Sequence, residues 1–168
     1  QDHKRIGEGD TGLNTGGMGA YAPAPLATPE LQRRILEEVL NPAVVGLSRV
    51  GSPFYGVLYA GLMIKDGKPY ALEFNARFGD PETQVVLPLL QTDLLDIIEA
   101  VVEHRLDQVQ VTWHQQAAVC VVLTSAGYPG SYPTGLPITG LPEQPTESVV
   151  VFHAGTTQPE QAVLTNGG

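Results

Sequence analysis

The stretch that decides the fold is YGVLYAGLMIKDGKPYALEFN, residues 55–75. Residues 55–64 are apolar and partly aromatic or β-branched, and residues 69–75 alternate between polar and apolar types. Between these runs, Asp66-Gly67 is a strong signal for a two-residue hairpin turn. The pattern therefore predicts two antiparallel strands joined by a tight turn.

The second predicted strand carries oxygen-bearing side chains on one face. Because side chains alternate along a strand, Glu73 and Asn75 are expected to share a side, with apolar neighbours on the other. A carboxylate and an amide oxygen suit Mg²⁺, which completes its octahedron with phosphate and water. Arg77 is expected near the same face, where its planar guanidinium can hold a phosphate or a carboxylate. An ordinary solvated strand face is the alternative for the first two residues.

The connection after this strand, residues 77–84, is too unusual for a plain link between a strand and a helix. Gly79 permits a tight bend and Pro81 can open the next helix. Asp80 and Glu82 also have simpler interpretations, as a helix N-cap and a favourable charge in the first helical turn.

A helix is predicted before the hairpin. Thr28 is expected to be its N-cap, Pro29 lies in its first turn, and apolar residues then recur at helical spacing. We expect the helix to end or kink at Pro42 before a possible last turn to Arg49.

After the hairpin, two more helical patterns cover residues 82–90 and 94–102, the second with Thr92 as its cap. From residue 117 the pattern changes to short β-like runs, at 117–124 and 149–153, broken by glycine and proline. We therefore predict an α+β chain with a boundary near residue 110, which gives one domain at 1–110 and a second at 111–168.

The composition excludes several classes of protein. A net charge of −9 and the small basic cluster His3-Lys4-Arg5 argue against nucleic-acid binding. The apolar runs are too short to cross a membrane. The single Cys120 has no disulfide partner, which indicates a reducing compartment and a cytoplasmic location.

Glycine recurs from residue 7 to residue 19, and we expect neither helix nor strand to run through this segment. Successive glycines can turn backbone N–H groups inward as an anion-binding nest. Residues 14–19, Asn14-Thr15-Gly16-Gly17-Met18-Gly19, could thus cradle a carboxylate or a sugar phosphate. A flexible linker is the alternative, and the segment lacks the lysine of a P-loop. The charges of His3-Lys4-Arg5 could steer phosphates or form a solvated chain end.

The run EFNARFGDPETQ, residues 73–84, resembles the signature of the glycinamide ribonucleotide synthetases, ATP-grasp enzymes also called phosphoribosylamine-glycine ligases. The resemblance extends over the whole chain, through the segments 1–5, 10–21, 59–64, 127–130, 152–156 and 165–168. Leu13 stands where relatives commonly carry proline. The resemblance implies that the fold is the second half of an ATP-grasp domain, an antiparallel sheet with flanking helices. Part of a small β-rich C-terminal domain would follow.

The resemblance also implies roles for individual residues. Glu73 and Asn75 would hold Mg²⁺ or Mn²⁺ against ATP phosphates, and Asn75 and Arg77 would act in catalysis. Many ATP-grasp relatives place another metal carboxylate on the preceding strand, but here Gly61 stands roughly opposite. Either phosphates and water would complete the ligand set, or an acid from elsewhere, such as Glu82 or a segment missing from these residues, would contribute. The residues implied in binding substrate or phosphate are Lys4, Arg5, Asp10, Asn14, Thr15, Gly16, Gly17, Met18, Gly19 and Arg77.

The implied reaction joins glycine to 5-phosphoribosylamine at the expense of ATP in purine biosynthesis. The portions that form the N-terminal domain and grip adenine in this family are absent from the 168 residues, so the chain by itself is expected to be inactive. Two alternatives remain at this point: another ATP-grasp ligase of purine synthesis, or a non-catalytic module that binds anions or nucleotides.

Overall fold

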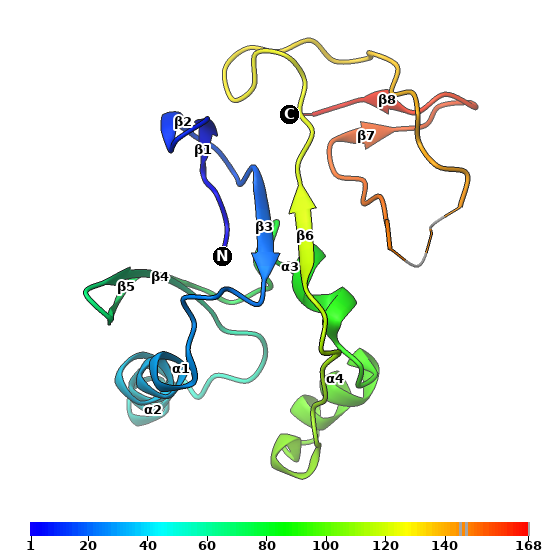
Figure 1. Ribbon diagram of the computed structural model, residues 1–168. Coiled ribbons are helices and arrows are strands. Elements are labelled where there is room, and N and C mark those ends of the chain that lie inside the picture. The colour runs from blue at the N-terminus through cyan, green and yellow to red at the C-terminus, as the bar shows by residue number, and fades with distance from the viewer. Residues whose placement is uncertain (145, 147, 168) are drawn as a thin grey trace. The chain divides into compact units, whose positions relative to one another are not determined.

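The computed structural model describes residues 1–144, 146 and 148–167 (Figure 1). The chain divides into two compact units. The first unit comprises Gln1–Asp2 and Ala20–Cys120, and the second comprises His3–Gly19 and Val121–Gly168. The predicted boundary near residue 110 is not tested by this division and stays a prediction.

The helix before the hairpin begins as predicted. Thr28 caps α1 (Pro29–Ile35) by accepting a hydrogen bond from the backbone N–H of Leu31. The helix does not end at Pro42. It passes through a π-helical turn, η1 (Leu36–Leu40), and continues as α2 (Asn41–Arg49). The wider turn lies directly before Pro42, which lacks an N–H for a normal helical bond.

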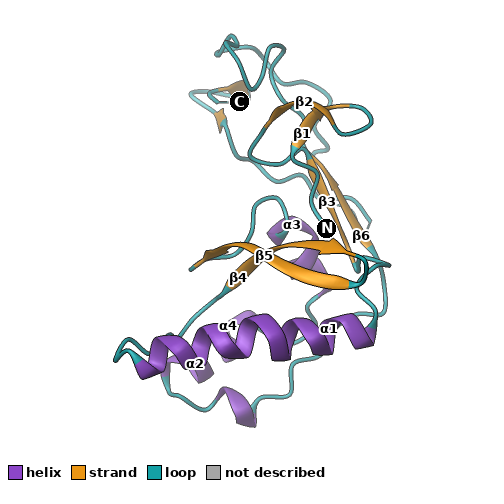
Figure 2. Ribbon diagram, turned by 90° about the vertical axis from the view of Figure 1, so that its left-hand side faces the viewer, coloured by secondary structure: helices purple, strands orange, loops and turns teal. Residues whose placement is uncertain are grey.

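The predicted hairpin is confirmed as β4 (Tyr59–Lys65) and β5 (Lys68–Asn75), which pair antiparallel. Asp66 and Gly67 form the turn with positive φ angles of 52° and 69°. The first strand starts at Tyr59 rather than at residue 55, because Gly56 takes a φ of 134° that breaks the extended run. Helices α1 and α2 lie along one side of the hairpin (Figure 2).

Of the two helices predicted after the hairpin, the first is shorter than predicted and the second has the predicted bounds. The stretch 82–90 forms α3 (Thr83–Val86) and the 3₁₀ turn η2 (Leu87–Leu89). Asp93 caps α4 (Leu94–Val102), with its carboxylate accepting from the N–H of Leu95. The predicted cap, Thr92, instead contacts the hydroxyl of Thr112 at 3.0 Å. The short turn η3 (Leu106–Gln108) follows.

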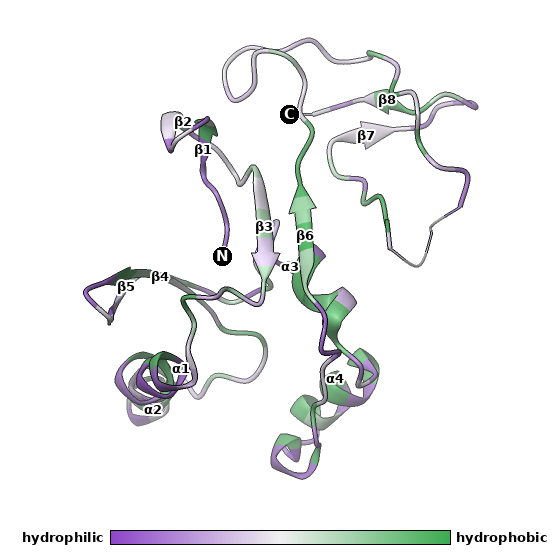
Figure 3. Ribbon diagram, in the orientation of Figure 1, coloured by the Kyte–Doolittle hydropathy of each residue, from purple (hydrophilic) through white to green (hydrophobic). Residues whose placement is uncertain are grey.

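The buried core of the first unit is small. Its buried apolar residues come from β3 (Gly19–Ala22), α1, α3, η2 and α4: Ala20, Leu31, Val85, Leu89 and Ala100. Strand β3 pairs with β6 (Ala118–Val121). Strand β6 is hydrophobic along its length (Figure 3), yet the side chains of Val119 and Val121 are exposed.

The second unit contains short strands in the segment that we expected to lack them. Strands β1 (Arg5–Gly7) and β2 (Thr11–Asn14) pair around a turn at residues 8–10. Residues with few side-chain contacts can still form a ladder, because the ladder is made by backbone groups. The structure also pairs β7 (Thr156–Thr157) with β8 (Leu164–Thr165), while the run 149–153 forms no strand.

Candidate active site

Strand β5 places Glu73 and Asn75 on the same face of the hairpin. Glu73 pairs with Gly61 and Asn75 pairs with Tyr59, and the irregularity in the ladder lies beyond these pairs, between Gly61 and Leu62. Two residues spaced by two along a regular strand point to the same side. The geometric part of the prediction is confirmed, and its assignment to metal binding stays a prediction.

Gly61 makes room for the side chain of Glu73. A Cβ atom at Gly61 would lie 2.9 Å from Cγ of Glu73 and 3.5 Å from its Oε1. The position opposite Glu73 therefore carries no carboxylate, as the sequence indicated, and any larger residue there would displace the Glu73 side chain. The carboxylate of Glu73 and the amide of Asn75 are the oxygen donors that a hard divalent ion prefers. The donor set thus fits Mg²⁺ or Mn²⁺ that also binds phosphate and water.

Glu82 is tied to the same hairpin by a tyrosine. The hydroxyl of Tyr59 donates a hydrogen bond of 2.6 Å to Oε1 of Glu82. Gly79 lies beneath both side chains, since a Cβ there would come within 2.8 Å of the Tyr59 ring and of the Glu82 carboxyl carbon. One oxygen of Glu82 is therefore engaged by Tyr59, which weakens the idea that Glu82 supplies the additional ligand.

The pKa of Tyr59 is raised above its usual value. Burial is the largest cause, followed by the hydrogen bond to Glu82 and by the negative charges of Glu82, Asp2 and Glu73. The phenol therefore stays protonated and remains a donor. Sequence reasoning missed Tyr59 as part of this region. Its place opposite Asn75 is the only local signal that could have indicated it.

The simpler interpretations, with Asp80 as the N-cap and Glu82 as a charge in the first helical turn, are wrong. Glu82 occupies the N-cap position of α3 but makes no capping hydrogen bond with its side chain. Asp80 accepts a bond of 2.8 Å from the side-chain amide of Gln84, and the hydroxyl of Thr83 donates to the Gly79 carbonyl. The bend is held by side chains that reach back over it.

Arg77 lies beyond the end of β5, so strand alternation does not govern its direction. Its guanidinium is exposed and donates a bond of 2.8 Å to the carbonyl of Phe78. The predicted role of Arg77 toward a phosphate stays a prediction.

In the second unit, the β1–β2 hairpin holds several of the predicted substrate residues. Asp10 lies in its turn with a φ of 60°. The guanidinium of Arg5 donates to the carbonyl of Gly12 at 2.6 Å, so Arg5 clamps its own hairpin. The backbone carbonyl of Lys4 accepts bonds from the N–H and the hydroxyl of Thr15, at 2.7 and 2.8 Å.

The N–H groups of the glycine loop, defined as residues 14–19, differ from the predicted open nest. The N–H of Gly16 donates to the hydroxyl of Tyr128 at 3.1 Å, and the N–H of Gly17 donates to the hydroxyl of Thr15 at 3.1 Å. The N–H of Met18 donates to the carbonyl of His3 at 2.7 Å. These N–H groups donate to acceptors within the protein. They therefore stabilise the conformation of the loop and are not free to bind an anion.

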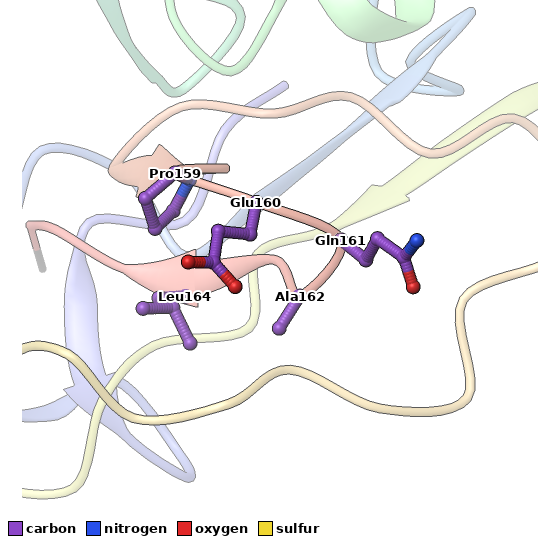
Figure 4. Close-up of a pocket in the computed structure, with 5 residues that line it drawn as sticks. All are labelled: Pro159, Glu160, Gln161, Ala162 and Leu164. Atoms are coloured by element: carbon purple, nitrogen blue, oxygen red, sulfur yellow. The ribbon is translucent and has the colours of Figure 1, made fainter.

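The structure gathers the predicted residues into two sets. Glu73, Asn75 and Arg77 belong to the first unit, and all the predicted residues from Lys4 to Gly19 belong to the second. Among the described residues, no group of three or more His, Cys, Asp or Glu side chains is arranged to hold a metal ion. A surface hollow in the second unit is formed by one short segment, residues 159–164, and contains none of the predicted residues (Figure 4).

The mixed helix-and-strand fold, with its small antiparallel sheets, matches part of an ATP-grasp domain followed by part of a C domain. The family model for the phosphoribosylglycinamide synthetase ATP-grasp (A) domain matches residues 1–83, and that for the C domain of the same synthetase matches residues 118–168. The chain belongs to the phosphoribosylglycinamide synthetase family.

Individual relatives agree with this assignment. The chain is 56% identical to the phosphoribosylamine–glycine ligase of Chlorobaculum tepidum and 52% identical to that of Vibrio parahaemolyticus. Both alignments cover all of this chain. They cover 40% of the length of the Chlorobaculum protein and 39% of that of the Vibrio protein. The crystal structure of the phosphoribosylamine–glycine ligase from Thermotoga maritima superposes with a TM-score of 0.85 at 36% identity, over 100% of this chain and 41% of that one. The chain thus spans about two fifths of the length of the relatives it matches.

None of the helices in the described part of the chain has both the length and the apolar character needed to span a bilayer.

Proposed function

We propose that this chain supplies the metal-binding hairpin, β4–β5, and the substrate-binding glycine loop of a ligase that joins glycine to 5-phosphoribosylamine with ATP. The products are glycinamide ribonucleotide, ADP and phosphate, and the reaction is a step of purine biosynthesis in the cytoplasm. The observation that carries the proposal is the pairing of Glu73 and Asn75 on one face of β5, opposite a glycine that leaves room for the carboxylate.

The reaction has two steps. A glycine carboxylate oxygen attacks the γ-phosphorus of ATP, so that ADP leaves and glycyl phosphate forms. The amine of phosphoribosylamine then attacks the acyl carbon, phosphate leaves, and the amine loses a proton as the amide forms. Both steps depend on positioning and on neutralising negative charge more than on proton shuttling.

The residues of this chain would divide that work. A bound Mg²⁺ or Mn²⁺ supplies positive charge beside the transferred phosphoryl group. Glu73 and Asn75 would hold the ion, and Arg77 would leave the Phe78 carbonyl to bind a phosphate or carboxylate oxygen. Residues of the glycine loop, with Lys4, Arg5 and Asp10, would bind glycine or phosphoribosylamine. In this proposal the loop presents side chains and carbonyl groups, because its N–H groups at Gly16, Gly17 and Met18 already have partners.

The test uses a full-length ligase, meaning this sequence within a chain of the length of its relatives. Purified protein is mixed with Mg-ATP, glycine and phosphoribosylamine, and formation of glycinamide ribonucleotide and ADP is followed. We expect product with all three substrates and none when one is omitted. A protein that uses another amine or another acid in preference would contradict the proposal.

The 168-residue chain alone is the companion sample. We expect it to form no product, since the relatives' remaining length is needed to hold ATP. Normal turnover by this chain would show that the hairpin and loop suffice, which contradicts that part of the proposal.

A further inference from the structure

Two contacts from the C-terminal part of the chain hold the glycine loop. The N–H of Val122 donates to the carbonyl of Met18 at 3.0 Å, and the hydroxyl of Tyr128 accepts from the N–H of Gly16 at 3.1 Å. All four residues belong to the second unit. The loop lies in the region matched by the ATP-grasp domain, whereas Val122 and Tyr128 lie in the region matched by the C domain.

Tyr128 is itself held by a tight turn. Gly127, with a φ of 102°, allows this turn, and a Cβ there would collide with the carbonyl oxygen of Ser131. The N–H of Tyr128 donates to the carbonyl of Ser125 at 3.2 Å, and the N–H of Gly130 donates to the carbonyl of Gly127 at 2.8 Å. The ring of Tyr128 also packs against Tyr132, with centroids 5.9 Å apart. The phenol is thus positioned by the backbone around it.

The phenol oxygen of Tyr128 lies beside the Gly16 backbone. A Cβ at Gly16 would lie 3.6 Å from this oxygen, an ordinary van der Waals distance, so the contact does not depend on the missing side chain. Gly16 sits between Thr15, which bonds to Lys4, and Gly17, which bonds to Thr15. The Tyr128 hydroxyl therefore fixes the N–H of Gly16, between two residues that have other partners.

We propose that Tyr128, a residue of the C domain, is a positioning residue. Its hydroxyl holds the glycine loop in the one shape that binds glycine or phosphoribosylamine. This inference rests on the proposed function. It assigns to the C domain an indirect part, through the loop, in binding glycine or phosphoribosylamine, and no part in binding Mg-ATP.

Tyr128→Phe in the full-length ligase tests the proposal, because it removes one oxygen and keeps the ring against Tyr132. Tyr132→Phe is the matched control, since it also removes one phenol oxygen from the same ring pair but none that bonds to Gly16. Steady-state kinetics are measured separately for ATP, glycine and phosphoribosylamine. Loss of one neutral hydrogen bond predicts a rise of roughly fivefold in KM for the substrate held by the loop.

We expect the KM for ATP and kcat to stay within twofold in Tyr128→Phe, and all parameters of Tyr132→Phe to match the unaltered protein. Unchanged KM values for both glycine and phosphoribosylamine would overturn the positioning role. So would a loss of kcat and of ATP affinity together, which indicates a general effect on folding. These outcomes differ from failure of the proposed function, in which the unaltered protein itself forms no glycinamide ribonucleotide and both proposals fall.

Discussion

The β4–β5 hairpin and the glycine loop are the two segments to which the proposed function assigns ligand binding, and they obtain their shapes from partners at different distances along the chain. In the hairpin, partners such as Gly61 and Glu73 are twelve positions apart, and their register is set by the two-residue turn together with the ladder irregularity between Gly61 and Leu62. In the loop, Gly16 takes its partner 112 positions away, at Tyr128. Local patterns therefore specify the hairpin, while the loop depends on a distant part of the sequence.

The largest effect is expected at the hairpin, from Glu73→Ala in the full-length ligase. Removing the carboxylate should weaken Mg-ATP binding by about 100-fold, equivalent to about 2.8 kcal/mol, because a metal ligand is lost. Glu73 is exposed, so the unfolding temperature should hardly change. Isothermal titration calorimetry measures the affinity.

Glu37→Ala is the control for Glu73→Ala, since Glu37 is an exposed carboxylate whose surface ion pair with Arg33 contributes little. Equal Mg-ATP affinities in the two variants would show that Glu73 is not a metal ligand.

Among the residues that hold the glycine loop, we expect Gly127, in the turn before Tyr128, to be the least tolerant of substitution. Gly127→Ala forces a Cβ into a backbone with positive φ and onto the Ser131 carbonyl. We expect a loss of about 1–3 kcal/mol in the free energy of unfolding, measured by urea denaturation.

Gly46→Ala serves as the control for glycine replacement. Gly46 lies within α2, and a Cβ there meets nothing within 4 Å. This variant should be as stable as the unaltered protein or up to about 1 kcal/mol more stable. If Gly127→Ala behaved in the same way, the turn would not depend on its glycine.

Gly61→Ala tests the hairpin without touching a proposed ligand. The added methyl would displace the Glu73 side chain, so we expect Mg-ATP affinity to fall by about tenfold, or about 1.4 kcal/mol. Equilibrium binding of a fluorescent ATP analogue measures the change, with Gly46→Ala again as control. An unaltered affinity would mean that the Glu73 position matters less than proposed.

Tyr59→Phe should have the smallest effect, a loss of about 1 kcal/mol in unfolding free energy from the missing bond to Glu82. The folded state raises the pKa of Tyr59, so this contribution is fully present below the ordinary tyrosine pKa of about 10 and declines as the pH rises above it. Unfolding of both proteins between pH 8 and pH 11 measures this. The stability difference should shrink with rising pH, and a constant difference would contradict the assignment.

The sequence predicted those features that neighbouring residues determine. The Asp66-Gly67 turn, the Thr28 cap and the shared face of Glu73 and Asn75 all follow from positions a few residues apart. The resemblance to the synthetases also located the family that the comparisons show.

The wrong predictions have two causes: hydrogen-bond partners that lie far apart along the chain, and neighbouring residues that are equally suited to the same role. Thr92 and Asp93 are both good caps, and only the contact with Thr112, twenty positions on, assigns Asp93 to the helix. The open nest was predicted because no local pattern reveals that Tyr128 and His3 accept the loop's N–H bonds. Tyr59 was overlooked because its bond to Glu82 crosses from the hairpin to the following bend.

The central claim is that one side of β5 holds a divalent ion through an acid and an amide. A crystal of the full-length ligase with Mn²⁺ and a non-hydrolysable ATP analogue tests it through the anomalous scattering of manganese. The account predicts a peak within bonding distance of both the Glu73 carboxylate and the Asn75 amide oxygen, next to the phosphates. A manganese peak coordinated by other residues, with these two side chains unbound, would contradict it.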